Sequence, residues 1–260
     1  MKTSLKLILL YLIIAQIVAP ILIMIPYVIY QVVTTGNISD KALEPSLLVP
    51  TLLAGQFMVV VYLWKAGYIS KEKTTWSPIS GLYLFLSVLA IFSCWFIELA
   101  LMDFMKWLPN ILEYPFEILQ SSWEGILAIT IIGPIFEELL FRGAITKALL
   151  QQYNPTKAIL LSAFMFGIIH INPIQILPAF LTGILLAWIY YKTHSLTPCI
   201  IMHILYNSLS VYVSTQYPEA KYLDELISGT PYLITVFTSA LLLIGVIWLM
   251  RQITIHYPWK

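Results

Sequence analysis

Long apolar runs dominate this chain of 260 residues. Eight of them, separated by short stretches rich in prolines, glycines and charges, lie near residues 5–31, 46–64, 80–105, 124–151, 156–172, 174–191, 196–214 and 231–250. Each run reaches or exceeds the roughly 17 residues that the shortest membrane-spanning helix needs. The sequence therefore predicts an all-α, polytopic membrane protein with eight transmembrane helices.

Composition supports a membrane protein and argues against other classes. Hydrophobic residues make up 60% of the chain and charged residues only 10%, and the mean hydropathy is +0.86, which water-soluble domains of this length do not normally reach. The formal net charge of +1 gives no broad attraction to nucleic acid, and no basic patch with interleaved aromatic residues is present. Cys94 and Cys199 lack the spacing of a disulfide framework or a thiolate zinc site, so packing is their expected role.

Basic residues predict the orientation in the membrane, because cytosolic loops are enriched in Lys and Arg. With the N-terminus in the cytosol, only Lys41, Lys106 and Lys221 of the 14 Lys and Arg residues lie outside. The first apolar run is longer than the core of a signal peptide, so we interpret it as a retained first span. We expect both the N-terminus and the C-terminus in the cytosol.

Charged and strongly polar residues gather on three of the predicted helices in the second half of the chain. They are Glu137, Glu138 and Arg142 in the run 124–151, His170 in the run 156–172, and His203 and Asn207 in the run 196–214. A charge at the centre of a bilayer costs about 2.5–3.5 kcal/mol on insertion scales. We therefore expect a partner or a functional role for each charged residue.

Helical periodicity predicts two pairs and one free carboxylate among these residues. Glu138 and Arg142 are four residues apart and share a helix face, where the guanidinium can neutralise the carboxylate. His203 and Asn207 have the same spacing and form one polar stripe. Glu137 projects about 100° away from Glu138 around the helix, so it is free for another interaction.

The turn at Asn154 predicts which helices bring these groups together. Glu137 precedes this turn and His170 follows it by almost the same number of residues, so an antiparallel hairpin places the two at nearly equal depth. Phe166 lies one helical turn from His170 and is expected to form a wall of the same site. The polar stripe in 196–214 lies somewhat nearer the cytosol and reaches the others only if the helices tilt.

The chemistry of these side chains favours the activation of water. A carboxylate that faces a histidine in a partly dry cavity is suited to this task, so we expect Glu137 to act as a general base with His170. His203 and Asn207 are suited to binding the oxyanion of a tetrahedral intermediate. No serine or cysteine has a base partner in the sequence, and the expected nucleophile is therefore water.

Two other interpretations of the same residues remain. Glu137, His170 and His203 could coordinate zinc with a fourth position open. The local HExxH pairing is absent and an asparagine is a poor zinc ligand, so we expect that no cofactor is required. Alternatively, the polar residues, above all Glu138 and Arg142, only hold the helices together.

Three short motifs resemble those of a known family. "EELLFR" (residues 137–142), "FGIIH" (166–170) and "HILYN" (203–207) are similar, in this order, to the EExxxR, FxxxH and HxxxN/B motifs of the CPBP family, the CAAX proteases and bacteriocin-processing enzymes also called Abi. The resemblance covers about residues 124–214. It implies an intramembrane endopeptidase similar to the Ras-converting CAAX prenyl protease, with eight helices and a cavity open to the cytosol and the membrane.

By motif position, the resemblance implies the same roles as the chemistry. Glu137 would activate water with His170, and His203 with Asn207 would form the oxyanion hole. The substrate would be a membrane-associated peptide or protein, of the CAAX type or a leader or signal peptide. Some relatives are described as immunity proteins or scaffolds, so a non-proteolytic membrane protein of the same fold is the alternative.

The sequence predicts three parts. Residues 1–123 hold the first three spans without a motif, residues 124–214 form the catalytic core with spans four to seven, and residues 215–260 hold an outer loop and the last span. Glu138, Arg142 and Phe166 are expected to support the site. The polar residues are confined to one half of the chain, which argues against a transporter built from two equivalent halves. We expect a multi-pass protein of a prokaryotic plasma membrane.

Overall fold

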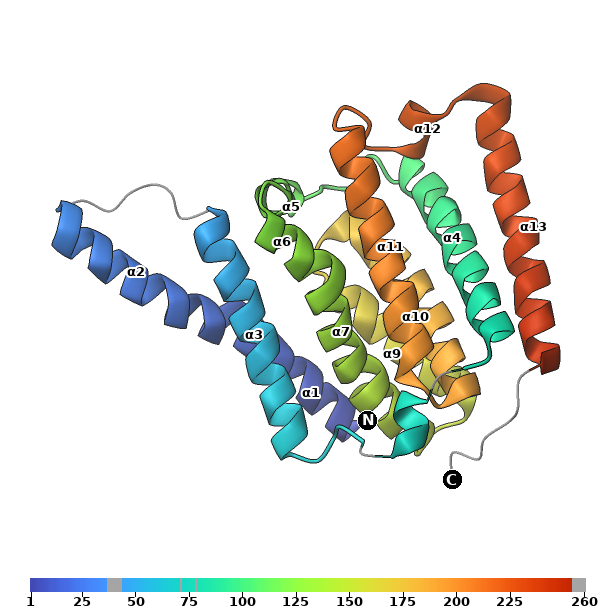
Figure 1. The fold of residues 1–260 in the computed structure, drawn as a ribbon, viewed down its shortest axis with the longest axis horizontal. Coiled ribbons are helices and arrows are strands. Elements are labelled where there is room, and N and C mark those ends of the chain that lie inside the picture. The colour runs from blue at the N-terminus through green and yellow to red at the C-terminus, as the bar shows by residue number, and fades with distance from the viewer. Residues whose placement is uncertain (37–43, 71, 78, 254–260) are drawn as a thin grey trace.

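The computed structural model describes residues 1–36, 44–70, 72–77 and 79–253. Over these residues the chain contains helices and no strand, and most of the helices pack side by side in a bundle (Figure 1). Six helical stretches in the described part are long and apolar enough to cross a membrane: Lys2–Thr35, made of α1 (Lys2–Ile13), η1 (Ile14–Val18) and α2 (Ala19–Thr35), then α3 (Pro45–Lys65), α4 (Gly81–Asp103), α10 (Pro173–Thr193), α11 (Leu196–Gln216) and α13 (Gly229–Ile253). The prediction of an all-α, multi-pass membrane protein is confirmed.

The other two predicted spans are helical but interrupted or short. The run 124–151 consists of α6 (Trp123–Leu127), η3 (Ala128–Ile132), α7 (Gly133–Glu138), η4 (Leu139–Thr146) and α8 (Lys147–Leu150), and both η3 and η4 are π-helical. The run 156–172 contains α9 (Pro155–Ile169), which has 15 residues. Eight crossings and the cytosolic position of both termini stay predictions; Lys41 and residues 254–260 lie outside the described residues.

Two short turns between helices follow from local sequence. At the start of α9, the side-chain oxygen of Asn154 accepts the N–H of Lys157 at 2.9 Å, and Pro155 occupies a first-turn position where no N–H is needed. At the start of α11, the Ser195 hydroxyl accepts the N–H of Thr197 at 3.2 Å. The predicted turn at Asn154 is therefore present, and α8 packs on α9 across it.

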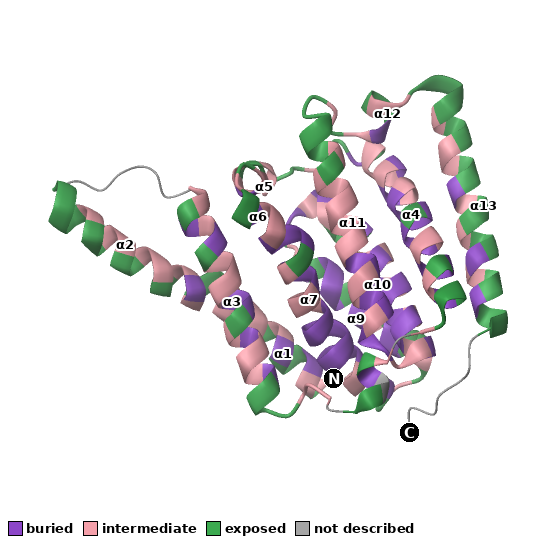
Figure 2. Cartoon of the chain, in the orientation of Figure 1, coloured by how far each residue is buried: buried purple, intermediate pink, exposed green. Residues whose placement is uncertain are grey.

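The protein core surrounds the segment that carries the two adjacent glutamates. All 8 residues of η4 are buried, and Phe141, Phe166 and Tyr190 are among the largest enclosed side chains. In contrast, α2 and α13 are mostly exposed or half-buried (Figure 2). Lipid is the expected surrounding of these exposed apolar helices, whereas Glu138 of α7 and Arg142 of η4 are enclosed by protein.

Two short helices cover the end of the bundle at which α4 ends. They are α5 (Glu113–Gln120) and α12 (Leu223–Leu226). The carboxylate of Asp103, in the last turn of α4, accepts the N–H of Leu223 at 3.0 Å, and Lys106 Nζ lies 2.6 Å from Asp224 Oδ1. The hydrogen bond to Asp224 raises the pKa of Lys106. These contacts tie α12 to the end of α4.

Candidate active site

The two adjacent glutamates lie at the end of α7, between the π-helical segments η3 and η4. Pro134 near the start of α7 cannot donate a backbone hydrogen bond, and a proline ring clashes with the carbonyl four residues earlier in a regular helix. Widening of the preceding turn in η3 relieves this clash. π-helical turns occur frequently at functional sites, and here they flank the most polar segment of the bundle.

Glu138 forms the buried centre of the site. Its Oε1 atom accepts hydrogen bonds from Arg142 Nη1 at 2.7 Å and from His203 Nδ1 at 2.8 Å. Glu138 and Arg142 are 0% and 1% exposed, so the pair is fully enclosed. The second guanidinium nitrogen of Arg142 donates to the carbonyl of Gly183 at 3.3 Å. The predicted Glu138–Arg142 pair is present, and Glu138 also orients the imidazole of His203.

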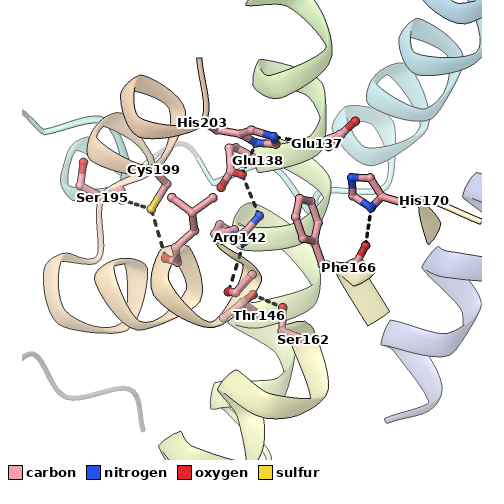
Figure 3. A network of polar contacts seen from close by, with 12 residues as sticks. Glu137, Glu138, Arg142, Thr146, Ser162, Phe166, His170, Ser195, Cys199 and His203 are labelled. Atoms are coloured by element: carbon pink, nitrogen blue, oxygen red, sulfur yellow. Dashed lines mark hydrogen bonds and ion pairs between the residues drawn. The ribbon is translucent and has the colours of Figure 1, made fainter. Parts of the chain in front are cut away.

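His203 lies between the two adjacent carboxylates (Figure 3). Its Nε2 atom is 3.8 Å from Glu137 Oε2, and its Nδ1 atom is bonded to Glu138. Because a carboxylate can only accept, the proton of a neutral His203 ring lies on Nδ1, and Nε2 is directed to the Glu137 side. The side chain of Glu137 remains 19% exposed, whereas that of Glu138 is 0% exposed, so only Glu137 is open to a bound molecule.

His170 lies at the end of α9, on the other side of Phe166. Its Nδ1 atom is 2.8 Å from the carbonyl oxygen of Phe166, which can only accept, so Nδ1 carries the proton and Nε2 is left as an acceptor. The Phe166 ring stands edge-on to both imidazoles, with centroid distances of 5.0 Å to His170 and 5.7 Å to His203. It also packs against the Arg142 guanidinium at 4.7 Å. Phe166 therefore packs against both histidines, in the position predicted for a wall of the site.

Asn207 takes a position that the sequence did not indicate. One helical turn beyond His203 on α11, its side-chain amide donates to the carbonyl of Ile129 in η3 at 2.9 Å. The carbonyl group that accepts this hydrogen bond thus belongs to the π-helical segment η3. An amide nitrogen has two hydrogens, so the second remains available to another acceptor.

Asn172 is a supporting residue that lies outside the three motifs. It is 0% exposed; its side-chain oxygen accepts the N–H of Ile111 at 3.0 Å, and its side-chain nitrogen donates to Asn110 at 2.7 Å. The preceding Ile171 has a φ of 61°, an unusual conformation for a β-branched residue. Since Ile171 directly follows His170, Asn172 fixes the strained turn that ends α9 at the site. The signal in the sequence is a polar residue before proline at a predicted helix end.

The same geometry bears on the zinc alternative. Both histidines donate Nδ1–H to an oxygen and direct Nε2 elsewhere, a pattern that metal-binding histidines share. Within the described ranges, however, no three His, Cys, Asp or Glu side chains are arranged to hold a metal ion. Zinc binding by Glu137, His170 and His203 stays an alternative prediction, which metal analysis of the active protein tests.

Comparison with known proteins agrees with the motifs. The profile of the family described as "Type II CAAX prenyl endopeptidase Rce1-like" matches residues 119–209, which include all three motifs. A Bacillus subtilis (strain 168) protein described as "Putative membrane peptidase YdiL" is 30% identical over 109 residues, which are 42% of this chain and 44% of that protein. The chain thus matches less than half the length of this relative. No solved structure matches the chain. The resemblance to the CPBP family is confirmed for this part of the chain.

Proposed function

We propose, from the resemblance of residues 119–209 to the CPBP family, that the chain is an intramembrane endopeptidase that uses a glutamate to activate water. The observation that carries the proposal is the placement of His203 between a buried, charge-paired Glu138 and a partly open Glu137. A bundle held together only by polar contacts has no need of the second carboxylate. Arg142 already pairs with Glu138, whereas Glu137 pairs with no Lys or Arg among the described residues and instead faces His203 Nε2 at 3.8 Å.

Glu137 would act as the general base. It takes a proton from a water molecule, whose oxygen then attacks the carbonyl carbon of the scissile peptide bond. The Nε2 atom of His170, left as an acceptor by the bond from Nδ1 to Phe166, would orient that water. When the C–N bond breaks, the proton on Glu137 passes to the leaving amine.

His203 and Asn207 would stabilise the oxyanion. Glu138 fixes the ring of His203 through Nδ1, and a proton on Nε2 would then point a charged donor to the Glu137 side of the site. Asn207 would contribute the amide hydrogen that its bond to Ile129 leaves unused. Positioned donors of this kind need no reorganisation during the reaction, which is the source of their effect on rate.

The substrate class follows from where the site lies. His203 and Asn207 lie on α11, which is long and apolar enough to cross a membrane and packs on α7, so the scissile bond would come from a membrane-associated peptide or protein. The family description suggests a CAAX-type substrate, and a leader or signal peptide has the same physical character. In the alternative, the chain is a non-proteolytic immunity or scaffold protein that cleaves no peptide bond.

Cleavage that depends on Glu137 tests the proposal. Purified wild-type protein in lipid nanodiscs would be incubated with farnesylated CAAX peptides and with a membrane peptidome, and new peptide ends would be identified by mass spectrometry. Glu137→Gln keeps the size of the side chain and should abolish cleavage. Glu124→Gln, an exposed glutamate in the first turn of α6, is the matched control and should cleave as the wild type does. Cleavage retained by Glu137→Gln, or absent from the wild type on both substrate sets, would contradict the proposal.

A further inference from the structure

A second carboxylate lies buried in the bundle, away from the catalytic groups. Glu98 on α4 is 1% exposed and receives three hydrogen bonds from neighbouring side chains. Its Oε1 atom accepts from the Cys94 thiol at 3.1 Å and the Thr182 hydroxyl at 2.7 Å, and its Oε2 atom accepts from the Tyr206 hydroxyl at 2.6 Å. These partners come from α4, α10 and α11, so one carboxylate connects three helices.

This arrangement is expensive for a membrane protein. A carboxyl group buried in a bundle loses its hydration by water, its three hydrogen bonds offset only part of that loss, and no ion pair in the described part of the chain includes Glu98. An apolar residue would fill the same space without that cost. The bond to Tyr206 is short, as expected when a hydroxyl donates to a carboxylate. This cost is explained if the hydrogen bond from Tyr206 to Glu98 fixes the rotation of a helix that apolar packing alone would leave free.

Tyr206 is placed to fix the rotation of α11. It lies three residues after His203 and directly before Asn207, so the bond to Glu98 holds the helical turn that carries both residues. Side-chain atoms lie about 5 Å from a helix axis, so a rotation of about 15° would move the imidazole by about 1.3 Å. A displacement of about 1 Å of a catalytic group can lower a rate by about 10²-fold.

We propose that Glu98 is a positioning residue of the proposed endopeptidase, acting through Tyr206 to set the rotation of α11 and thereby the placement of His203. The expected effect on rate rests on the proposed function. The expected effect on the rotation of α11 does not. Neither Glu98 nor Tyr206 would touch substrate.

The kinetic test removes the bond while keeping the ring. Tyr206→Phe should lower kcat by about 10- to 100-fold and change KM by less than about two-fold, because catalytic groups move while the substrate contacts stay. Ser210→Ala is the matched control: it removes another α4–α11 hydrogen bond, from Trp95 Nε1 at 2.9 Å, one turn beyond Tyr206, and should leave kcat within about two-fold of wild type.

Variants of Glu98 separate positioning from loss of folding. Glu98→Gln keeps a hydrogen bond to Tyr206, with the amide now donating to the phenol oxygen, and should restore most of the kcat that Glu98→Leu loses. Adding Tyr206→Phe to Glu98→Leu should cause no further loss, because both changes remove the same contact. Equal losses in Glu98→Gln and Glu98→Leu, or a kcat unchanged by Tyr206→Phe, would overturn the proposal.

A second measurement needs no catalytic activity. Spin labels at Phe57 on α3 and Tyr212 on α11, which are 60% exposed each, report the position of α11 by electron–electron double resonance. Tyr206→Phe should broaden or shift the distance distribution, and Ser210→Ala should leave it unchanged. An unchanged distribution in Tyr206→Phe would refute the positioning role even if Glu137 proves not to support cleavage, so the two proposals can fail separately.

Discussion

Glu138→Gln offers the clearest separation of charge from geometry in this site. The amide oxygen can occupy the place of Glu138 Oε1 and still accept from Arg142 and His203, while the amide nitrogen takes the place of Oε2, which has no hydrogen-bond partner in the described structure. The substitution therefore removes the negative charge and keeps both hydrogen bonds to Oε1, while the new amide nitrogen has no acceptor beside it among the described residues. The guanidinium of Arg142, 1% exposed, is left as an uncompensated buried cation.

The expected loss of stability is large. Removing one partner of a buried ion pair typically costs about 3–5 kcal/mol. For chains of about 150–250 residues each kcal/mol shifts Tm by about 2–4 °C, so the apparent Tm should fall by roughly 6–20 °C. Glu137→Gln is the matched control because its carboxylate is partly exposed, lies 3.8 Å from His203 Nε2 and pairs with no Lys or Arg among the described residues, and its apparent Tm should change by less than about 3 °C.

A thiol-reactive fluorophore provides the assay. Cys94 and Cys199 are both buried, so labelling during a temperature ramp reports unfolding of purified protein in a fixed detergent. The double variant Glu138→Gln with Arg142→Met removes both charges and should recover much of the lost Tm, since no unpaired charge remains. An apparent Tm of Glu138→Gln within about 3 °C of wild type, or a double variant no more stable than the single one, would refute the assignment of Glu138 as the buried counter-ion.

Three further outcomes are expected. Asn207→Ala should lower kcat by about 10²–10³-fold with little change in KM, as for loss of an oxyanion donor; a raised KM at constant kcat would instead assign it to substrate binding. Activity should survive exhaustive chelation, and stoichiometric zinc whose removal and return switch activity off and on would show that Glu137, His170 and His203 are ligands. A cysteine at position 154 should resist labelling from outside sealed cells; efficient external labelling would reverse the predicted orientation.

The sequence by itself determined the features that depend on short stretches of chain. Apolar run length predicts membrane helices, and the spacing of Glu138 and Arg142 predicts their ion pair because residues four apart share a face of a helix. The cap at Asn154 predicts the turn that brings the end of α9 back toward Glu137. The order of the three motifs was sufficient for the family resemblance.

The tertiary structure alone decided how these helices face one another. It directed His203 to both glutamates, bonded Asn207 to Ile129, and connected Glu98 to Tyr206. None of these contacts follows from residue spacing, because each joins helices whose relative rotation and tilt are set by packing over their whole length. The π turns of η3 and η4 add to this, since each changes the periodicity of 3.6 residues per turn from which side-chain directions are read.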